Sequence, residues 1–489
     1  MNYPTNKTYT QVLKMMGWIV FAVVACRLTS GWFTLFITGL GVWCALARKP
    51  GWAICHYIFL PFLLSINYIL LPKSDLVWNI GLRVGPLVIA LALSVGAVRR
   101  PGSHRLPFAG ILPFLAIACI SSIHGYAPQI SYMKLINYFL FLLGLWLGTQ
   151  NLNHSPNDTG VIRTMFLAMI FMVVYVSIAL IPFPVISFAT GLRGYYGTET
   201  LETINAIGRE MRAAGEQTLF CGMMCHSQWL SPFSVISFAF LICDMLFVEK
   251  RIRVPHLITL VLLLPILYMT RSRVAIVTFI AAMVLINFYT ITKLRLGANM
   301  KRNVRNMMLM FSVAVVIGGV VMEVKDNTLS RWLRKTNDVA SDKRGIAEAV
   351  TDSRRGLIEA CMYDYHRNPM FGSGFQVDVF SGDILKRTSG FVFSAPIEKG
   401  VLPVMVLGET GIVGLMFFLF FLISFYYTCV RRHLFVTITM FTILFVSNLG
   451  EATFFSPGGL GGVLWIMTVV GGFVLDTIIL IDNQRLFVR

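Results

Sequence analysis

The chain has 489 residues, of which 56% are apolar and 13% are charged, and its mean hydropathy is +0.72. Soluble globular proteins are about a quarter charged, so this composition excludes that class and indicates an integral membrane protein. The formal net charge of +18 comes from short basic clusters beside apolar runs, such as Arg99 with Arg100, which is typical of cytoplasmic anchoring charges rather than of a nucleic-acid partner.

Apolar runs long enough to cross a bilayer recur along the chain. A spanning helix needs roughly 20 predominantly apolar residues. On that rule we predict an all-α polytopic membrane protein with about fourteen spans. Their expected centres, in chain order, are Ile19, Phe36, Phe59, Val88, Phe114, Leu140, Met172, Ala239, Leu263, Ile280, Val315, Leu415, Phe441 and Val469. The nine cysteines are scattered without a CxxC pair, so we expect neither a disulfide scaffold nor a zinc site. No acidic DxD pair is evident in the outward loops, and we expect no metal and no cofactor.

The connections between the expected spans carry their positive charge on one side. If the N-terminus is cytoplasmic, nearly all Lys and Arg residues of short loops fall in cytoplasmic connections, as the positive-inside rule requires. These connections are residues 48–50, 99–105, 151–163, 249–253, 293–305 and 431–433. Both termini are then expected in the cytoplasm.

Two long connections remain on the outward side. The longer one holds eleven of the chain's 23 Asp and Glu residues beside twelve Lys and Arg residues, and mixed apolar and charged faces predict helices in it at 331–339 and 353–368. The shorter one has a candidate amphipathic helix from Thr203 to Met211. The expected organisation is N-terminal spans in 1–183, a first outward loop in 184–229, central spans in 230–322, the large outward loop in 323–400 and C-terminal spans in 401–489.

Arg271 and Arg273 lie where one expected span ends and the next begins, on the outward side. A charge inside a span costs roughly 2.5–3.5 kcal/mol on insertion scales, and outward arginines oppose the positive-inside bias. One interpretation is that they reach lipid phosphates by snorkelling. The other is a diphosphate clamp at headgroup height, because the planar guanidinium fork matches phosphate oxygens.

A second arginine pair, Arg354 and Arg355, opens the expected helix before Pro369. Alone, such a pair is more often a solvated helix face. Here it is followed by the sequence NPMFGSG at 368–374, where proline and two glycines should close the helix, and by the run PIEKGVLPVMVLGETGIVGL at 396–415.

In this order the motifs resemble the O-antigen ligase and polymerase superfamily of bacterial polysaccharide assembly. The superfamily pattern has an SR pair at the outward end of a mid-chain span, matched by Ser272 and Arg273. A large periplasmic loop then carries an Arg and a P-x-x-G-x-G turn, matched by Arg354 and by 369–374. An E-x-G-I-x-G run follows in the next span, matched by 409–414. The resemblance covers about the C-terminal half by motif and the whole chain by topology.

Two positions depart from the pattern. Ile358 stands where the superfamily has a tryptophan, which is a loss of packing rather than of chemistry. The ligases carry a histidine just before the E-x-G-I-x-G span, where this chain has Glu398, Lys399 and Gly400, and His366 lies on the other side of the turn. These departures favour the polymerase branch, with the ligase branch as the alternative.

The resemblance implies a metal-independent glycosyltransferase whose donor is a glycan on a polyprenyl diphosphate. Arginines would stabilise the negative charge that grows on the leaving diphosphate, and a base would accept the proton of the acceptor hydroxyl. The catalytic residues expected from it are Arg273, Arg354 and Glu398, with Asp352 and His366 as further candidate bases. The expected substrate-binding residues are Arg193, Arg212, Arg271, Arg355 and His366.

Other roles for these carboxylates stay open. An ion pair with Lys399 is the alternative role of Glu398. We expect Glu409 to hydrogen-bond a neighbouring helix and Asp244 to be an interfacial charge near the cytoplasmic face.

The sequence therefore predicts a polymerase of O-antigen or exopolysaccharide in the bacterial inner membrane, with its active site facing the periplasm. Its expected partners are a lipid-linked oligosaccharide donor and acceptor, membrane lipids, a chain-length regulator and a flippase, and no nucleic acid. A flippase or other transporter is the alternative from a different class, since about fourteen spans is also a transporter number. Transporters commonly show internal repeats, and this sequence shows none.

Overall fold

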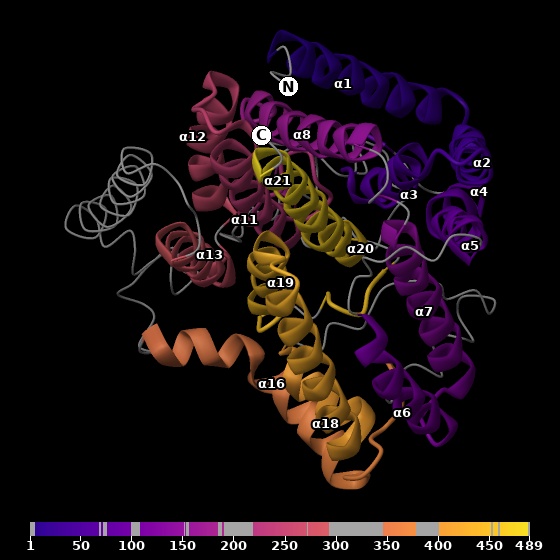
Figure 1. Cartoon of the computed structure of the whole chain (residues 1–489). Coiled ribbons are helices and arrows are strands. Elements are labelled where there is room, and N and C mark those ends of the chain that lie inside the picture. The colour runs from indigo at the N-terminus through magenta and orange to yellow at the C-terminus, as the bar shows by residue number, and fades with distance from the viewer. Residues whose placement is uncertain are drawn as a thin grey trace. The chain divides into compact units, whose positions relative to one another are not determined.

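The computed structural model of the chain (Figure 1) describes residues 5–67, 70–71, 76–98, 108–150, 152, 156–183, 188–189, 219–270, 272–292, 346–377, 401–450, 453–457 and 460–487. Within these ranges the chain is almost entirely helical. The strands found there are β1 (Phe188–Ala189) and β2 (Leu219–Phe220), which pair antiparallel. The expected helical class is confirmed for the described residues.

The chain divides into two compact units, one made of Met1–Val173 with Leu357–Arg489 and one made of Val174–Gly356. The first, unit 1, contains α1 (Thr5–Leu28), α2 (Trp32–Leu46), α3 (Pro50–Ser65), α4 (Leu76–Asn79), η1 (Ile80–Val84), α5 (Gly85–Val98), η2 (Phe108–Ile111), α6 (Leu112–Ile123), α7 (Pro128–Gln150), α18 (Leu402–Arg431), α19 (Phe435–Ser447), α20 (Leu460–Trp465), η5 (Ile466–Val470) and α21 (Gly471–Phe487). The second, unit 2, contains the two strands, α11 (Ser227–Cys243), η4 (Asp244–Glu249), α12 (Val254–Met269) and α13 (Arg273–Thr292). The unit boundaries fall inside α8 (Pro156–Ala179) and α16 (Ile346–Arg367).

Six of the described helices are long and apolar enough to cross a membrane: Thr8–Leu28, Pro128–Gln150, Asn157–Ala179, Trp229–Val248, Leu402–Arg431 and Gly461–Ile481. Shorter apolar helices of 10–17 residues accompany them. Each expected span centre lies in a described helical segment except Val315, which is outside the described residues. The chain is therefore a multi-pass helical membrane protein, and a total of about fourteen spans stays a prediction.

Some apolar runs contain a wider π turn. Among the residues that the structure describes, the π segments are η1, η4 and η5, and each continues directly into or out of an α-helix. Because lipid offers no hydrogen-bond partners, backbone groups in a span must be bonded within the protein. The π turns keep the helical hydrogen bonding continuous, and such turns are frequent at functional sites.

Unit 1 has an aromatic core between α6, α7 and α18. Phe114 of α6 stacks on Phe455 with ring centroids 5.4 Å apart, and Tyr138 of α7 lies edge-on to the same ring at 5.2 Å. Phe418 of α18 lies 5.5 Å from Phe114. Helix α6 contacts α7 and also packs along α18 (Figure 1). Edge-on and offset aromatic pairs add stability beyond the burial of apolar surface, so this core fixes the three helices relative to one another.

A buried carboxylate joins α19 and α21. Asp476 of α21 accepts hydrogen bonds from the backbone N–H groups of Val436 and Thr437 at 3.0 and 2.8 Å, and from the Thr437 hydroxyl at 2.8 Å. These N–H groups belong to the first turn of α19, which has no intrahelical acceptor for them and carries partial positive charge. Asp476 is therefore a helix cap, which accounts for a charge in an apolar helix.

Candidate functional site

The chain makes a tight turn directly after α16. Pro369 disfavours helical backbone at the residue before it, and α16 ends at Arg367. The N–H of Gly372 donates to the carbonyl of Asn368 at 2.8 Å. Residues 368–374, called the NPMFGSG turn below, thus close the helix as the sequence predicted.

The long helix α18 is broken at Gly411. This residue has φ 66° and ψ −170°, a region that only glycine adopts without strain. In an unbroken helix, the N–H groups of Ile412 and Val413 would donate to the carbonyls of Gly408 and Glu409. The break leaves these two donors and two acceptors without their intrahelical partners.

The NPMFGSG turn supplies a partner to each of the four freed groups. The hydrogen bonds, donor first, are Ser373 N to Gly408 O at 3.0 Å, Gly374 N to Glu409 O at 3.0 Å, Ile412 N to Pro369 O at 2.9 Å and Val413 N to Met370 O at 3.4 Å. Irregular backbone inside a membrane protein is tolerated where protein satisfies it, and here the turn does so. We call this contact the turn–break junction.

Two glycines allow the backbones of the junction to approach closely. A Cβ on Gly372 would overlap the carbonyl carbon of Glu409, and a Cβ on Gly411 would overlap that of Met370. In both places the obstacle is backbone, which cannot move aside as a flexible side chain can. The glycine of each motif, P-x-x-G-x-G and E-x-G-I-x-G, therefore leaves room for the backbone of the other motif.

A third segment, the last turn of α6 and the connection to α7, completes the junction. The hydroxyl of Ser121 donates to the carbonyl of Glu409 at 2.6 Å, and the N–H of Tyr126 donates to the carbonyl of Ser373 at 3.1 Å. Glu409 is buried, and these contacts are made by its backbone carbonyl, which accepts from two segments. The expected hydrogen bond of the Glu409 side chain to a neighbouring helix stays a prediction. The junction thus unites three parts of the chain that are distant in sequence.

The segment after the turn, residues 375–377, is buried and is held by α7. Ser131 donates its hydroxyl to the carbonyl of Phe375 at 2.8 Å, and the ammonium of Lys134 donates to the carbonyl of Gln376 at 2.7 Å. Gln376 has φ 54°, which is unusual for a residue with a side chain, and its amide donates to the carbonyl of Phe455 at 2.7 Å. We call residues 375–377 the strap.

Tyr126 also makes a polar contact with α16. Its hydroxyl donates to Oδ1 of Asp364 at 2.9 Å, and Asp364 is buried with 6% exposed. Burial, and after it the hydrogen bond to the Asp364 carboxylate, raises the pKa of Tyr126. The phenol therefore stays protonated at neutral pH and remains a donor to the carboxylate.

The predicted SR pair begins a helix of unit 2. Arg273 is the first residue of α13 and is half-buried. The hydroxyl of Ser272 accepts a hydrogen bond from the N–H of Ala275 at 3.3 Å, so Ser272 is the N-cap. The motif is therefore a helix start with its arginine in the first turn.

Of the other predicted site residues, the structure describes a few. Arg355 is exposed on α16, and His366 is exposed in the last turn of that helix. Arg354 lies in α16, but its side chain is outside the described part of the chain, as is that of Asp352. Outside the described residues altogether are Arg193, Arg212, Arg271 and Glu398. That the predicted arginines converge on one site stays a prediction.

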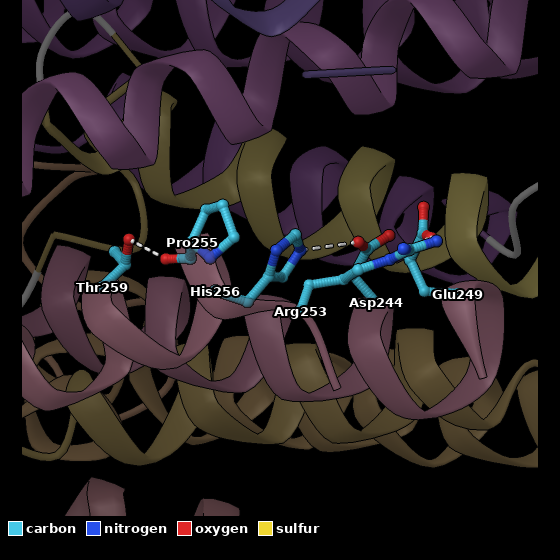
Figure 2. A network of polar contacts seen from close by, with 6 residues as sticks. All are labelled: Asp244, Glu249, Arg253, Pro255, His256 and Thr259. Atoms are coloured by element: carbon cyan, nitrogen blue, oxygen red, sulfur yellow. Dashed lines mark hydrogen bonds and ion pairs between the residues drawn. The ribbon is translucent and has the colours of Figure 1, made fainter. Parts of the chain in front are cut away.

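Unit 2 contains a buried pair of titratable side chains. Figure 2 shows Nε2 of His256 directed at Oδ2 of Asp244, 3.0 Å away, and the two side chains are 1% and 0% exposed. Nearer the turn of the same hairpin, Nη2 of Arg253 lies 2.8 Å from Oε2 of Glu249. Asp244 is buried within the protein rather than exposed, because His256 of α12 supplies a hydrogen-bonded partner for the carboxylate. Its place near the cytoplasmic face stays a prediction.

Four residues of unit 1 were not recognised from the sequence as candidates. Lys134 could have been recognised, since it is the one charged residue in the apolar run of α7. An ionisable residue in a span is by default a candidate functional residue. No such signal marks Tyr126, Asp364 or Arg367, because their contact is made across 238 positions of sequence.

A comparison with models of known protein families finds no match, and neither does a comparison with curated proteins. The resemblance drawn above therefore rests on the motifs of this chain.

Proposed function

We propose that this protein is an integral-membrane glycosyltransferase of the GT-C-like helical type, with about fourteen spans. It polymerises oligosaccharide repeat units, delivered on polyprenyl diphosphate, into O-antigen or exopolysaccharide. The reaction takes place at the periplasmic face of the bacterial inner membrane.

The observation that carries the proposal is the turn–break junction. The resemblance uses the P-x-x-G-x-G turn and the E-x-G-I-x-G run as separate motifs. In the folded chain their backbones are bonded to each other by four hydrogen bonds, and their glycines allow the close approach. Two motifs matched by chance would have no reason to bond to each other residue by residue. The junction therefore supports the interpretation that the two motifs form one structural unit.

The proposed reaction moves a glycan between two lipid-linked units. The acceptor hydroxyl oxygen attacks the anomeric carbon of the donor, its proton passes to Glu398, and the bond from that carbon to the diphosphate breaks. The diphosphate leaves with the bonding electron pair, and Arg273 and Arg354 stabilise its added negative charge. The guanidinium suits this role because it stays charged and presents paired donors.

The test is the glycan profile of a strain that lacks the protein and is complemented with wild type, Arg273→Ala or Arg354→Ala at matched membrane abundance. We expect each variant to lose long chains while single repeat units still reach their final acceptor. Arg431→Ala, at the end of α18 on the expected cytoplasmic side, is the matched control and should keep the wild-type profile. Full activity of both arginine variants would contradict the proposal that these arginines bind the diphosphate.

The same profile separates the polymerase from the ligase. Long chains that accumulate on the polyprenyl carrier, with none on lipid A core or another acceptor, would mean that the protein transfers finished glycans. Loss of long chains on every carrier supports polymerisation.

The broken helix also suggests a transporter, because transporters use discontinuous helices to coordinate their solutes. In those proteins the unwound backbone faces a cavity. In this chain all four groups freed at Gly411 bond to the NPMFGSG turn, so none of them is left to hold a solute. The junction therefore favours the glycosyltransferase.

A further inference from the structure

Arg367, the last residue of α16, is exposed and lies against an aromatic ring. Its Cζ is 5.6 Å from the ring centroid of Tyr126. Within the described ranges, no carboxylate forms an ion pair with its guanidinium. A guanidinium beside an aromatic ring keeps its charge and its planar fork of N–H donors. The Arg367 guanidinium also acts on the Tyr126 hydroxyl, where it opposes the larger effects of burial and of Asp364 on the pKa of that phenol.

The ring that holds Arg367 is itself fixed at two points. The hydroxyl of Tyr126 donates to the buried carboxylate of Asp364, and its backbone N–H donates to the carbonyl of Ser373 in the NPMFGSG turn. Gly125 packs so closely on Gly374 that a Cβ there would lie 2.9 Å from the Gly374 Cα. The ring beside Arg367 is therefore anchored to the turn–break junction, and a contact with an anchored ring lowers the entropy that the guanidinium loses when it binds a ligand.

We propose that Arg367 binds phosphoryl oxygens, with Tyr126 and Asp364 as its positioning residues. A guanidinium with restricted motion and no carboxylate partner among the described residues is suited to bidentate contact with a phosphate. The exposed imidazole of His366, beside it in the last turn of α16, adds a second possible donor. That the phosphoryl group belongs to the lipid-linked diphosphate rests on the function proposed above; the other source of the same chemistry is an anionic phospholipid headgroup.

A second arginine of unit 1 provides a matched control. Arg431, in the last turn of α18, has its Cζ 5.5 Å from the ring centroid of Tyr427. The contact has the same chemistry and nearly the same distance. Tyr427 is 59% exposed and is not one of the residues that form the turn–break junction. It lies at the end of α18 that the positive-inside rule assigns to the cytoplasm.

The experiment uses the purified full-length protein in phosphatidylcholine nanodiscs and titrates it with inorganic pyrophosphate in a calorimeter. Loss of a charge-assisted contact should weaken binding about tenfold or more in Arg367→Ala. Arg367→Lys keeps the charge and loses the planar fork, so it should fall between wild type and Arg367→Ala. Arg431→Ala should bind as wild type does. Equal binding by wild type and Arg367→Ala, or equal loss in Arg367→Ala and Arg431→Ala, would overturn the proposal.

The positioning role has its own readout. Tyr126→Phe keeps the ring and removes the hydroxyl bond to Asp364, so it should weaken pyrophosphate binding less than Arg367→Ala does. In Arg367→Ala, adding Tyr126→Phe should cause no further loss. An additional loss in the double variant would show that Tyr126 does not act through Arg367.

Nanodiscs that contain phosphatidylglycerol distinguish the two sources. If the headgroup occupies the site, this lipid will weaken pyrophosphate binding by wild type but not the residual binding by Arg367→Ala. If the site is reserved for the diphosphate, both lipids will give the same affinity. The glycan profile keeps this inference separate from the proposed function: an Arg367-dependent pyrophosphate site in a protein whose deletion leaves long glycans intact would retain the site and reject the polymerase.

Discussion

Two regions of the chain bury polar groups among apolar side chains, and they do so by different means. At the turn–break junction of unit 1 the buried groups are backbone donors and acceptors, and the contact joins residues as far apart as Ser121 and Glu409, 288 positions away. In the α11–α12 hairpin of unit 2 they are the titratable side chains of Asp244 and His256, only 12 positions apart.

The difference teaches what each region can tolerate. Backbone groups carry no net charge, so the junction depends on the small size of its glycines. The hairpin pair depends on charge, because a buried carboxylate needs a hydrogen-bonded partner. Changes of size should therefore break the junction, and changes of charge should break the hairpin.

The largest effect is expected at the hairpin. Asp244→Ala leaves the imidazole of His256 buried without its carboxylate, and breaking a buried pair in this way costs about 3–5 kcal/mol. The measurement is the free energy of unfolding of the purified protein in mixed detergent micelles.

Two controls accompany Asp244→Ala. Joint replacement of Asp244 and His256 by leucine should recover most of the loss, because apolar residues of similar volume often replace a buried pair without cost. Glu249→Gln weakens the more exposed pair with Arg253 and should cost about 0.3–0.5 kcal/mol. Equal effects of Asp244→Ala and Glu249→Gln would mean that burial adds nothing to the Asp244–His256 contact.

A slightly smaller effect is expected from a change of size at the junction. Gly411→Ala introduces a Cβ that overlaps the carbonyl of Met370 and forces a side chain into a backbone region favourable to glycine, which together cost about 3 kcal/mol. Polymer length should fall with stability if the junction positions the site. The unfolding free energy and the glycan profile are the two measurements.

The chain offers matched glycines for that comparison. Gly160 in α8 and Gly356 in α16 have no atom within 4 Å of an added Cβ. Alanine there should stabilise the protein by about 0.5–1 kcal/mol, because glycine is the poorer helix former. If Gly411→Ala behaved like these two variants, the junction would not depend on close approach.

The sequence predicted local structure well and tertiary contacts poorly. Apolar run length located the helices, and Pro369 located the end of α16, because both signals act within a few residues. The break at Gly411 gave no such signal: the run around it is as apolar as a continuous span, and the reason for the break is the turn bonded to it from 35 positions away. The motifs indicated that both segments matter but not that they touch.

Side-chain burial was the second limit. The burial of Asp244 was not foreseen because the sequence does not reveal that His256 faces it across the hairpin. The same holds for the carboxylate of Asp364, whose partner Tyr126 belongs to another part of the chain. Among the predicted arginines, the local role of Arg273 at a helix start is visible, whereas Arg367 was passed over because no motif contains it.

A third prediction tests whether a single charge can support a backbone contact. Lys134→Met removes the ammonium that donates to the carbonyl of Gln376, and an unsatisfied buried acceptor costs about 1–3 kcal/mol. The strap should then open more often, which hydrogen exchange of a peptide covering residues 375–377 measures. Lys14→Met, at an exposed position of α1, is the control and should leave that exchange unchanged. Equal exchange in both variants would show that Lys134 does not hold the strap.

The smallest effect is expected from Tyr126→Phe, which removes one partly exposed hydrogen bond and should cost about 0.5 kcal/mol at neutral pH. The pKa of Tyr126 is raised above its ordinary value of 10.0, so its contribution to stability is fully present below pH 10 and is lost as the pH rises through the raised pKa. Wild type should therefore lose more stability than Tyr126→Phe above pH 10, and the two should converge there. Tyr363→Phe, at a position 62% exposed, is the control and should follow wild type across the range. A constant difference between wild type and Tyr126→Phe at all pH values would mean that the phenol does not donate to Asp364, and the support of Arg367 would then rest on the ring alone.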